Sequence, residues 1–189
     1  TPQAIATANP SLDPERLPVG APMRVPMNFP VVPTDVPMTS GLCSLCIRGL
    51  VGRYPSLFRM EALTTTAFGR PVEALSIGVG PRDVLYTAAH HANEWITATL
   101  LLAFAEDLAK AAVVGAVIGG YPARGTLQTT TIHMVPMVDP DGVDLVTGAL
   151  PPDSGDYAFA RSLASYYPDI PFPNGWKANL LGIDLNLNY

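Results

Sequence analysis

The sequence predicts an α/β domain in which helices flank a mixed central sheet. Residues 84–89 and 129–138 are short apolar runs of strand length, and residues 95 to about 114 carry apolar side chains at helical spacing. Of the 189 residues, 48% are hydrophobic and 14% are charged, which is a globular composition. The chain can therefore bury one sizeable core between strands and helices.

The charge balance argues against nucleic acid and anionic membranes as partners. The chain carries 11 Lys+Arg against 16 Asp+Glu, a net charge of −5. This balance gives no electrostatic reason to expect nucleic acid or an anionic membrane surface as partner. No apolar run approaches the roughly 20 residues of a transmembrane helix, so we expect no membrane span.

Residues 1–26 differ in pattern from the rest of the chain. Asn9 can cap a short helix between Ala8 and Leu17 with Pro10 in its first position, and an extended piece follows at Met23–Pro26. The ordered string resembles the second half of a LysM repeat, a module that binds N-acetylglucosamine-containing glycans. A half-module this small cannot bury enough surface to hold itself together. We expect a partial LysM-like glycan-binding module that is disordered or leans on the next domain.

Residues 27–41 are expected to form a Pro-rich extended linker, because proline alternates there with apolar and small polar residues. The main domain then spans 42–189. Its first helix is expected at Leu42–Tyr54, after a Thr39-Ser40 cap.

Two cysteines, Cys43 and Cys46, lie on this first helix with Cys-Xaa-Xaa-Cys spacing. A redox site or half of a zinc site would have this spacing. No second cysteine pair accompanies them, and no strand leads into them. With Leu42, Leu45, Cys46 and Leu50 on one predicted apolar face, the cysteines are better explained as small hydrophobic residues.

Strands are expected at 58–64 and 72–78, joined by the turn 68–71, and again at 84–89 and 129–138. A turn at Asp139-Pro140-Asp141-Gly142 should close the last strand, and a short helix is expected at Asp156–Tyr166.

The segment His91-Ala92-Asn93-Glu94-Trp95 follows the strand at 84–89 and precedes the long helix. With Asn93 as N-cap, Glu94 would lie in the first helical turn, and His91 and Glu94 would converge just outside the carboxyl end of the strand. An imidazole and a carboxylate at this spacing suit a catalytic zinc ion. A hydrogen-bonded pair without metal has the same spacing, and the His-Glu-Xaa-Xaa-His signature is absent.

Four strings in this order resemble the zinc carboxypeptidase family. They are Phe68-Gly69-Arg70-Pro71, His91-Ala92-Asn93-Glu94-Trp95-Ile96-Thr97, Val138-Asp139-Pro140-Asp141-Gly142 and Gly182-Ile183-Asp184-Leu185-Asn186-Leu187-Asn188-Tyr189. The resemblance runs from about Leu42 to Tyr189 and implies the N-terminal half of that peptidase domain, an incomplete carboxypeptidase-like fold. Asn93, in place of the family's usual Arg, and the LysM-like leader are most similar to bacterial γ-D-glutamyl-diamino acid endopeptidases, which cut peptidoglycan stem peptides.

By this resemblance, His91 and Glu94 are ligands of Zn²⁺, and Asn186 binds the substrate carboxylate. The third zinc ligand and the general-base glutamate belong to the family's second half, so we expect no catalytic residue within this chain. Leu181 and Leu187 stand where the family has an oxyanion-stabilising and a carboxylate-binding arginine. Removal of one oxyanion donor costs about 100- to 1000-fold in rate.

We therefore expect a fragment of a peptidase that is inactive alone and holds metal weakly. Its expected ligand is a peptidoglycan peptide or glycan. Its expected protein partner is the missing C-terminal half of the domain or a second copy of the chain. A secreted or wall-associated bacterial protein follows from the same resemblance. Two alternatives stay open, a non-catalytic wall-binding pseudo-peptidase and a zinc deacylase of N-acyl amino acids.

The other histidines are weak candidates for the third ligand. His90 should point away from His91 if the strand continues through it, and His133 lies within a predicted strand, where it would pack or form hydrogen bonds.

Overall fold

The computed structural model describes residues 5–6, 9–23 and 29–187. The chain divides into two compact units, Thr1–Pro30 and Val31–Tyr189. None of the described helices combines the length and apolarity that a membrane crossing requires.

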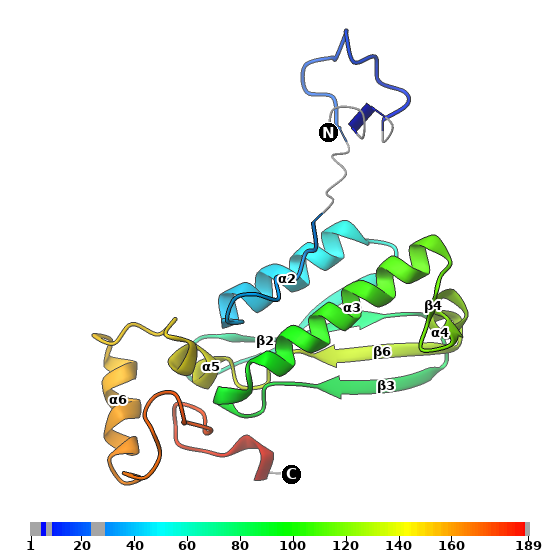
Figure 1. Ribbon diagram of the computed structural model, residues 1–189. Coiled ribbons are helices and arrows are strands. Elements are labelled where there is room, and N and C mark those ends of the chain that lie inside the picture. The colour runs from blue at the N-terminus through cyan, green and yellow to red at the C-terminus, as the bar shows by residue number, and fades with distance from the viewer. Residues whose placement is uncertain (1–4, 7–8, 24–28, 188–189) are drawn as a thin grey trace. The chain divides into compact units, whose positions relative to one another are not determined.

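A mixed four-stranded sheet forms the centre of the second unit (Figure 1). Its strands are ordered β1 (Phe58–Thr65), β2 (Pro71–Ile77), β6 (Thr130–Val135) and β3 (Arg82–Thr87). The pairs β1–β2 and β2–β6 are antiparallel, and β3–β6 is parallel. Since parallel neighbours need a crossover, helix α3 (Ile96–Val114) leads the chain from β3 back toward β6. The expected mixed α/β fold is confirmed.

Helices α2 (Ser40–Arg53) and α3 lie side by side over one face of this sheet (Figure 1). The Thr39 side chain accepts a hydrogen bond from the N–H of Leu42, so the predicted cap of α2 is correct. Helix α3 ends at Gly115, whose φ of 74° is left-handed and suits glycine.

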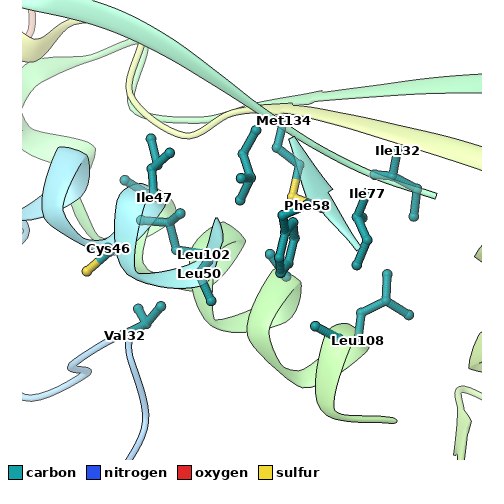
Figure 2. Close-up of a cluster of buried hydrophobic side chains, with 14 of the residues drawn as sticks. Val32, Cys46, Ile47, Leu50, Phe58, Ile77, Leu102, Leu108, Ile132 and Met134 are labelled. Atoms are coloured by element: carbon teal, nitrogen blue, oxygen red, sulfur yellow. The ribbon is translucent and has the colours of Figure 1, made fainter. Parts of the chain in front are cut away.

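The main hydrophobic core lies between these two helices and the sheet (Figure 2). Ile47, Leu50, Leu102, Ile77 and Met134 are each at most 1% exposed. Burial of one such side chain stabilises a fold by about 1.5–3 kcal/mol. The core therefore fixes the two helices against the sheet and so fixes the position where α3 begins.

Both cysteines of α2 are part of this core. Cys43 and Cys46 are 4% and 2% exposed, whereas Leu45 is 61% exposed and does not belong to the buried face on which we placed it. Burial, with help from neighbouring negative charges, raises the pKa of Cys43 to about 12 and that of Cys46 to about 11. Protonated, buried thiols are poor nucleophiles, which supports their role as small hydrophobic residues.

The segment before α2, from Val31 onward, belongs to the second unit and contributes to its core. Val32 and Met38 are 1% and 0% exposed, and both belong to the main core. The buried carboxylate of Glu106 on α3 accepts hydrogen bonds from the N–H of Val31 at 2.9 Å and of Val32 at 3.0 Å. Part of the predicted linker therefore contributes side chains to the domain.

Smaller elements complete the unit. After α3 come β4 (Val117–Ile118), β5 (Tyr121–Pro122) and α4 (Ala123–Thr129), none of which the sequence analysis identified. Two helices, α5 (Pro140–Thr147) and α6 (Gly155–Ala164), follow β6. They pack in a second hydrophobic cluster with the loop around Trp176, which is 3% exposed.

The expected turn at Asp139–Gly142 is wrong, because these residues begin helix α5. The Asp139 side chain accepts a hydrogen bond from the N–H of Gly142 at 2.9 Å, and Pro140 occupies the first helical position. Asp and Pro favour helix starts for the same reasons that they favour turns, so local sequence did not separate the two.

In the first unit, the expected helix between Ala8 and Leu17 is also wrong for the described residues 9–17, which form separate turns. The N–H of Leu12 donates to the carbonyl of Asn9 at 3.0 Å, and that of Arg16 donates to Asp13 at 3.1 Å. Pro14 has no N–H to continue a helix between these turns. The expected extended piece at Met23–Pro26 falls mostly outside the described residues, and the LysM-like module stays a prediction.

Candidate active site

The His91–Glu94 pair lies just beyond the carboxyl end of β3. The strand ends at Thr87, and a single 3-10 turn, η1 (Ala92–Glu94), follows with His91 in its N-cap position. Helix α3 begins only at Ile96. The prediction of Asn93 as helix cap is therefore wrong, and Glu94 lies in the 3-10 turn instead of the first α-helical turn.

The two side chains converge. Nδ1 of His91 lies 3.1 Å from Oε1 of Glu94, and the side chains are 14% and 46% exposed. This distance would suit an ion pair, but the buried Nδ1 makes no hydrogen bond, because the two groups are not aligned for one. A lone pair on Nδ1 beside a carboxylate oxygen is the arrangement that two ligands of one cation adopt.

The opposite ring nitrogen is bound by a residue that the sequence analysis did not single out. Nε2 of His91 lies 3.2 Å from Oδ1 of Asp184. An ionised carboxylate can only accept, so Asp184 favours the tautomer with the proton on Nε2, which is the tautomer that leaves Nδ1 free to bind a metal. Metal-binding histidines usually have such a carboxylate partner on their second nitrogen.

The chain segment that carries Asp184 is tied to η1. The N–H of Ala92 donates to the carbonyl of Lys177 at 3.0 Å, and the indole N–H of Trp176 donates to the carbonyl of Asn179 at 3.2 Å. Ala92 is fully buried in the second hydrophobic cluster. A sequence signal for Asp184 existed, because it lies in the last of the four family-like strings.

Asn186, the expected substrate-binding residue, lies in the 3-10 turn η2 (Leu185–Leu187) and is exposed. Its backbone N–H donates to Oδ1 of Asp184 at 3.0 Å, so the same carboxylate oxygen contacts both His91 and the backbone of Asn186. The structure thus brings Asn186 close to the His91–Glu94 pair along one short segment.

The two leucines at arginine positions are both exposed to solvent. Leu181 is 45% exposed and Leu187 is 78% exposed. Leu181 and Leu185 line a cavity of about 210 Å³, together with Asp139. Neither leucine supplies a cation for a substrate carboxylate or an oxyanion.

Asp139 is a further buried acid beside the pair. It is 2% exposed, and its Oδ2 makes no hydrogen bond. Its pKa is raised from 3.8 to about 7, mainly by burial and also by the charge of Asp141. The hydrogen bond from the Gly142 N–H and the charges of His91 and Arg70 partly oppose this rise. The sequence analysis placed this residue in a turn and gave it no role.

The loop that leads into β2 is bound to α5 by charge pairs. Arg70 contacts Asp141 at 2.9 Å and Asp144 at 2.6 Å, and the hydroxyl of Thr66 donates to Asp141 at 3.0 Å. Asp144 also accepts from the N–H of Ser40 at 2.8 Å. These bonds fix α5 and, through it, Asp139.

A third metal ligand is not found among the residues that the structure describes, since they contain no group of three or more His, Cys, Asp and Glu side chains that could hold a metal ion. His133 is engaged within the sheet, as predicted. Its Nδ1 lies 2.9 Å from Oγ of Ser76, and its Nε2 lies 3.0 Å from Oδ1 of Asp83. The pair therefore fits zinc as two of the three protein ligands that a catalytic site uses.

The family model described as zinc carboxypeptidase matches residues 45–189. The γ-D-glutamyl-L-diamino acid endopeptidase 1 of Lysinibacillus sphaericus is 34% identical over 140 residues, which are 74% of this chain and 34% of that protein. The chain thus spans about a third of the length of this relative.

Solved structures share the fold. A crystal structure of thrombin-activatable fibrinolysis inhibitor matches with a TM-score of 0.58 at 14% identity, over 80% of this chain and 32% of that one. The bovine protein in complex with tick carboxypeptidase inhibitor gives a TM-score of 0.52 at 15% identity, over 77% and 38% of the two chains. At these identities the likeness concerns the fold alone.

Proposed function

Since this chain belongs to the zinc carboxypeptidase family, we propose that it is the part of a zinc-dependent peptidase that supplies two of the metal ligands. The bond attacked is the γ-D-glutamyl-diamino acid bond of peptidoglycan stem peptides. Support for this substrate comes from the L. sphaericus endopeptidase, a relative named for that bond.

The observation that carries the proposal is the state of His91. Its Nε2 is occupied by Asp184, and its Nδ1 is buried, without a hydrogen bond and 3.1 Å from Oε1 of Glu94. A structural histidine would use both nitrogens, as His133 does. The unused nitrogen beside a carboxylate supports a cation site.

Within this site each residue has a separate task. His91 and Glu94 would hold zinc, which would supply Lewis-acid polarisation of the scissile carbonyl. Asp184 keeps the proton on Nε2 and orients the ring. Asn186 is proposed to hold the substrate carboxylate from the exposed turn η2. No catalytic acid or base is assigned to this chain.

The proposed substrate implies a location for the protein. A peptidase of wall peptides acts outside the bacterial cytoplasm, so we propose a secreted or wall-associated bacterial protein. Residues 1–26 would then hold the enzyme on wall glycan through the LysM-like module.

A partner is proposed for one apolar face, which we define by Tyr86, Leu100, Leu101 and Phe104. Tyr86 and Leu100 are 47% and 70% exposed, and the four residues line a cavity of about 430 Å³. The outer edge of β3 has no neighbouring strand in the described sheet. Such edges and faces favour association. The occupant is either the remaining part of the peptidase domain or a second copy of the chain.

Leu181 and Leu187 favour a second candidate, a wall-binding module that has lost its chemistry. An apolar side chain at both positions leaves no cation for the substrate carboxylate or the oxyanion. The two candidates differ in hydrolysis of a γ-D-glutamyl-diaminopimelate peptide when this chain is part of a complete peptidase domain, because only the enzyme would cleave it.

Zinc titration of the chain tests the metal site itself. We expect one zinc ion per chain with weak affinity, lost in His91→Ala and in Glu94→Ala. His133→Ala is the matched control, because its imidazole is bound by Ser76 and Asp83 and should leave zinc binding unchanged. Equal binding by His91→Ala and the wild type would end the proposal.

A further inference from the structure

We propose that Thr97 is a positioning residue for the metal pair, an inference that rests on the proposed zinc site and adds a residue to it. Its side-chain hydroxyl joins the end of β3 to the turn that carries Glu94. It does so by accepting one hydrogen bond and donating another.

The chain changes direction at Ala89, two residues before His91. Ala89 has a φ of 48°, and in the part of the chain that the structure describes it is the single non-glycine residue with positive φ. This left-handed conformation is unfavourable for an L-residue with a side chain, and surrounding bonds must hold it. Strain of this kind concentrates at functional sites.

Both backbone polar groups of Ala89 are held. The N–H of Ala89 donates to Oγ1 of Thr97 at 2.9 Å. The carbonyl of Ala89 accepts from the N–H of Asp139 at 3.0 Å. Ala89 is 2% exposed, so without Thr97 its N–H would be a buried donor that has lost its partner.

Thr97 also fixes the second member of the pair. Its hydroxyl donates to the backbone carbonyl of Glu94 at 2.7 Å. A hydroxyl can accept and donate at once, which valine of nearly the same shape cannot do. One side chain thus sets the distance between the backbone that leads to His91 and the backbone of Glu94.

The test uses the 189-residue chain and four variants. Thr97→Val removes the hydroxyl, and Thr97→Ser keeps it. Thr99→Val is the matched control, because Thr99 lies on the same helix, is 3% exposed and has a hydroxyl without a hydrogen-bond partner. The double variant Ala89→Gly/Thr97→Val relieves the strain at residue 89, since glycine adopts positive φ freely.

Three quantities are measured for each variant. They are the affinity for zinc, the amide exchange rate of Ala89 and the NMR signal of the His91 Nε2–H. In Thr97→Val we expect affinity for zinc to fall by about 10- to 100-fold, as for loss of other groups that orient ligands. Amide exchange of Ala89 should accelerate about tenfold, which corresponds to one net hydrogen bond. Thr97→Ser and Thr99→Val should change neither quantity, and Ala89→Gly/Thr97→Val should regain part of the zinc affinity.

Equal zinc affinity and equal Ala89 exchange in Thr97→Val and Thr97→Ser would overturn the inference. An equal loss of zinc affinity in Thr99→Val and Thr97→Val would also overturn it, because the effect would then be a general destabilisation of α3. If the wild type takes up no zinc, the proposed function fails instead. The role of Thr97 is then decided by the Nε2–H signal of His91, which should broaden in Thr97→Val and persist in Thr99→Val.

Discussion

His91 and Asp184 are separated by 93 positions in sequence, yet Nε2 of the imidazole lies 3.2 Å from Oδ1 of the carboxylate. This contact favours a proton on Nε2 of His91, which is the tautomer in which Nδ1 can bind a metal. It also joins the strand–helix junction at His91 to the loop before η2. The metal pair and the segment with Asn186 are therefore parts of one site.

The first prediction concerns this contact. Asp184→Ala should weaken zinc binding by about 10- to 100-fold, because His91 loses the carboxylate that orients its ring. Competition with a chromophoric chelator measures the affinity. Asp169→Ala, at an exposed loop position, is the control and should bind zinc like the wild type. Wild-type affinity in Asp184→Ala would show that the contact does not orient His91.

The second prediction concerns the pH dependence of stability. Burial raises the pKa of Asp139 to about 7, so the folded chain binds this proton more tightly than the unfolded chain does. Between about pH 4 and pH 7 the folded state holds more protons, and the free energy of unfolding should fall as the pH rises through this window. Below about pH 4 the Asp139 carboxyl is protonated in both the folded and the unfolded state. Above about pH 7 it is ionised in both, and the free energy of unfolding falls no further on its account.

Asp139→Asn removes this titration and keeps an oxygen that can cap α5. Between about pH 5 and pH 8, the free energy of unfolding of the wild type should fall by about 2–3 kcal/mol relative to that of the variant. Urea unfolding in the presence of a chelator measures both curves. If the free energies of unfolding of the wild type and the variant change with pH in parallel, Asp139 is ionised throughout this range and other interactions offset the cost of its burial.

The third prediction concerns the two thiols. With pKa values raised to about 12 for Cys43 and about 11 for Cys46, both thiols should remain protonated and unreactive at neutral pH. A thiol reagent should modify both in urea and neither in the folded chain, on a timescale at which a small free thiol reacts fully. Rapid labelling of the folded chain, or a disulfide between them, would restore the redox interpretation.

The fourth prediction concerns the apolar face of Tyr86, Leu100, Leu101 and Phe104. If this face binds a second copy, Leu100→Lys should shift the isolated chain toward monomer, because a charge would have to be buried in the contact. Val114→Lys is the control, at a 75% exposed position near the end of α3. Sedimentation velocity measures the distribution. A wild-type chain that is monomeric at all concentrations would leave the remaining part of the peptidase domain as the sole proposed occupant.

Apolar runs of strand length and the helical apolar pattern were enough to predict the four main strands, α2 and α3. The elements that were missed or misjudged, such as α5, depend on whether a short Asp- and Pro-rich segment finds a surface to pack on. Leu145 and Val143 of α5 are fully buried, and only the assembled domain provides their contacts.

The His91–Glu94 pair was visible in the sequence because three positions of spacing bring two side chains together in any tight helical turn. The contacts made with that pair were not visible, although Asp184, Asp139 and Thr97 all lie in the strings that resemble the family. Asp184 and Asp139 reach the pair from segments far along the chain that only folding brings near. Thr97 acts on it from the first turn of α3, and the strained Ala89 has no local sequence signal. Sequence by itself determined the periodic elements and the ligand pair. Tertiary structure decided the carboxylate partner of His91 and the bonds that hold the pair, because hydrogen bonds between distant segments depend on how the chain packs.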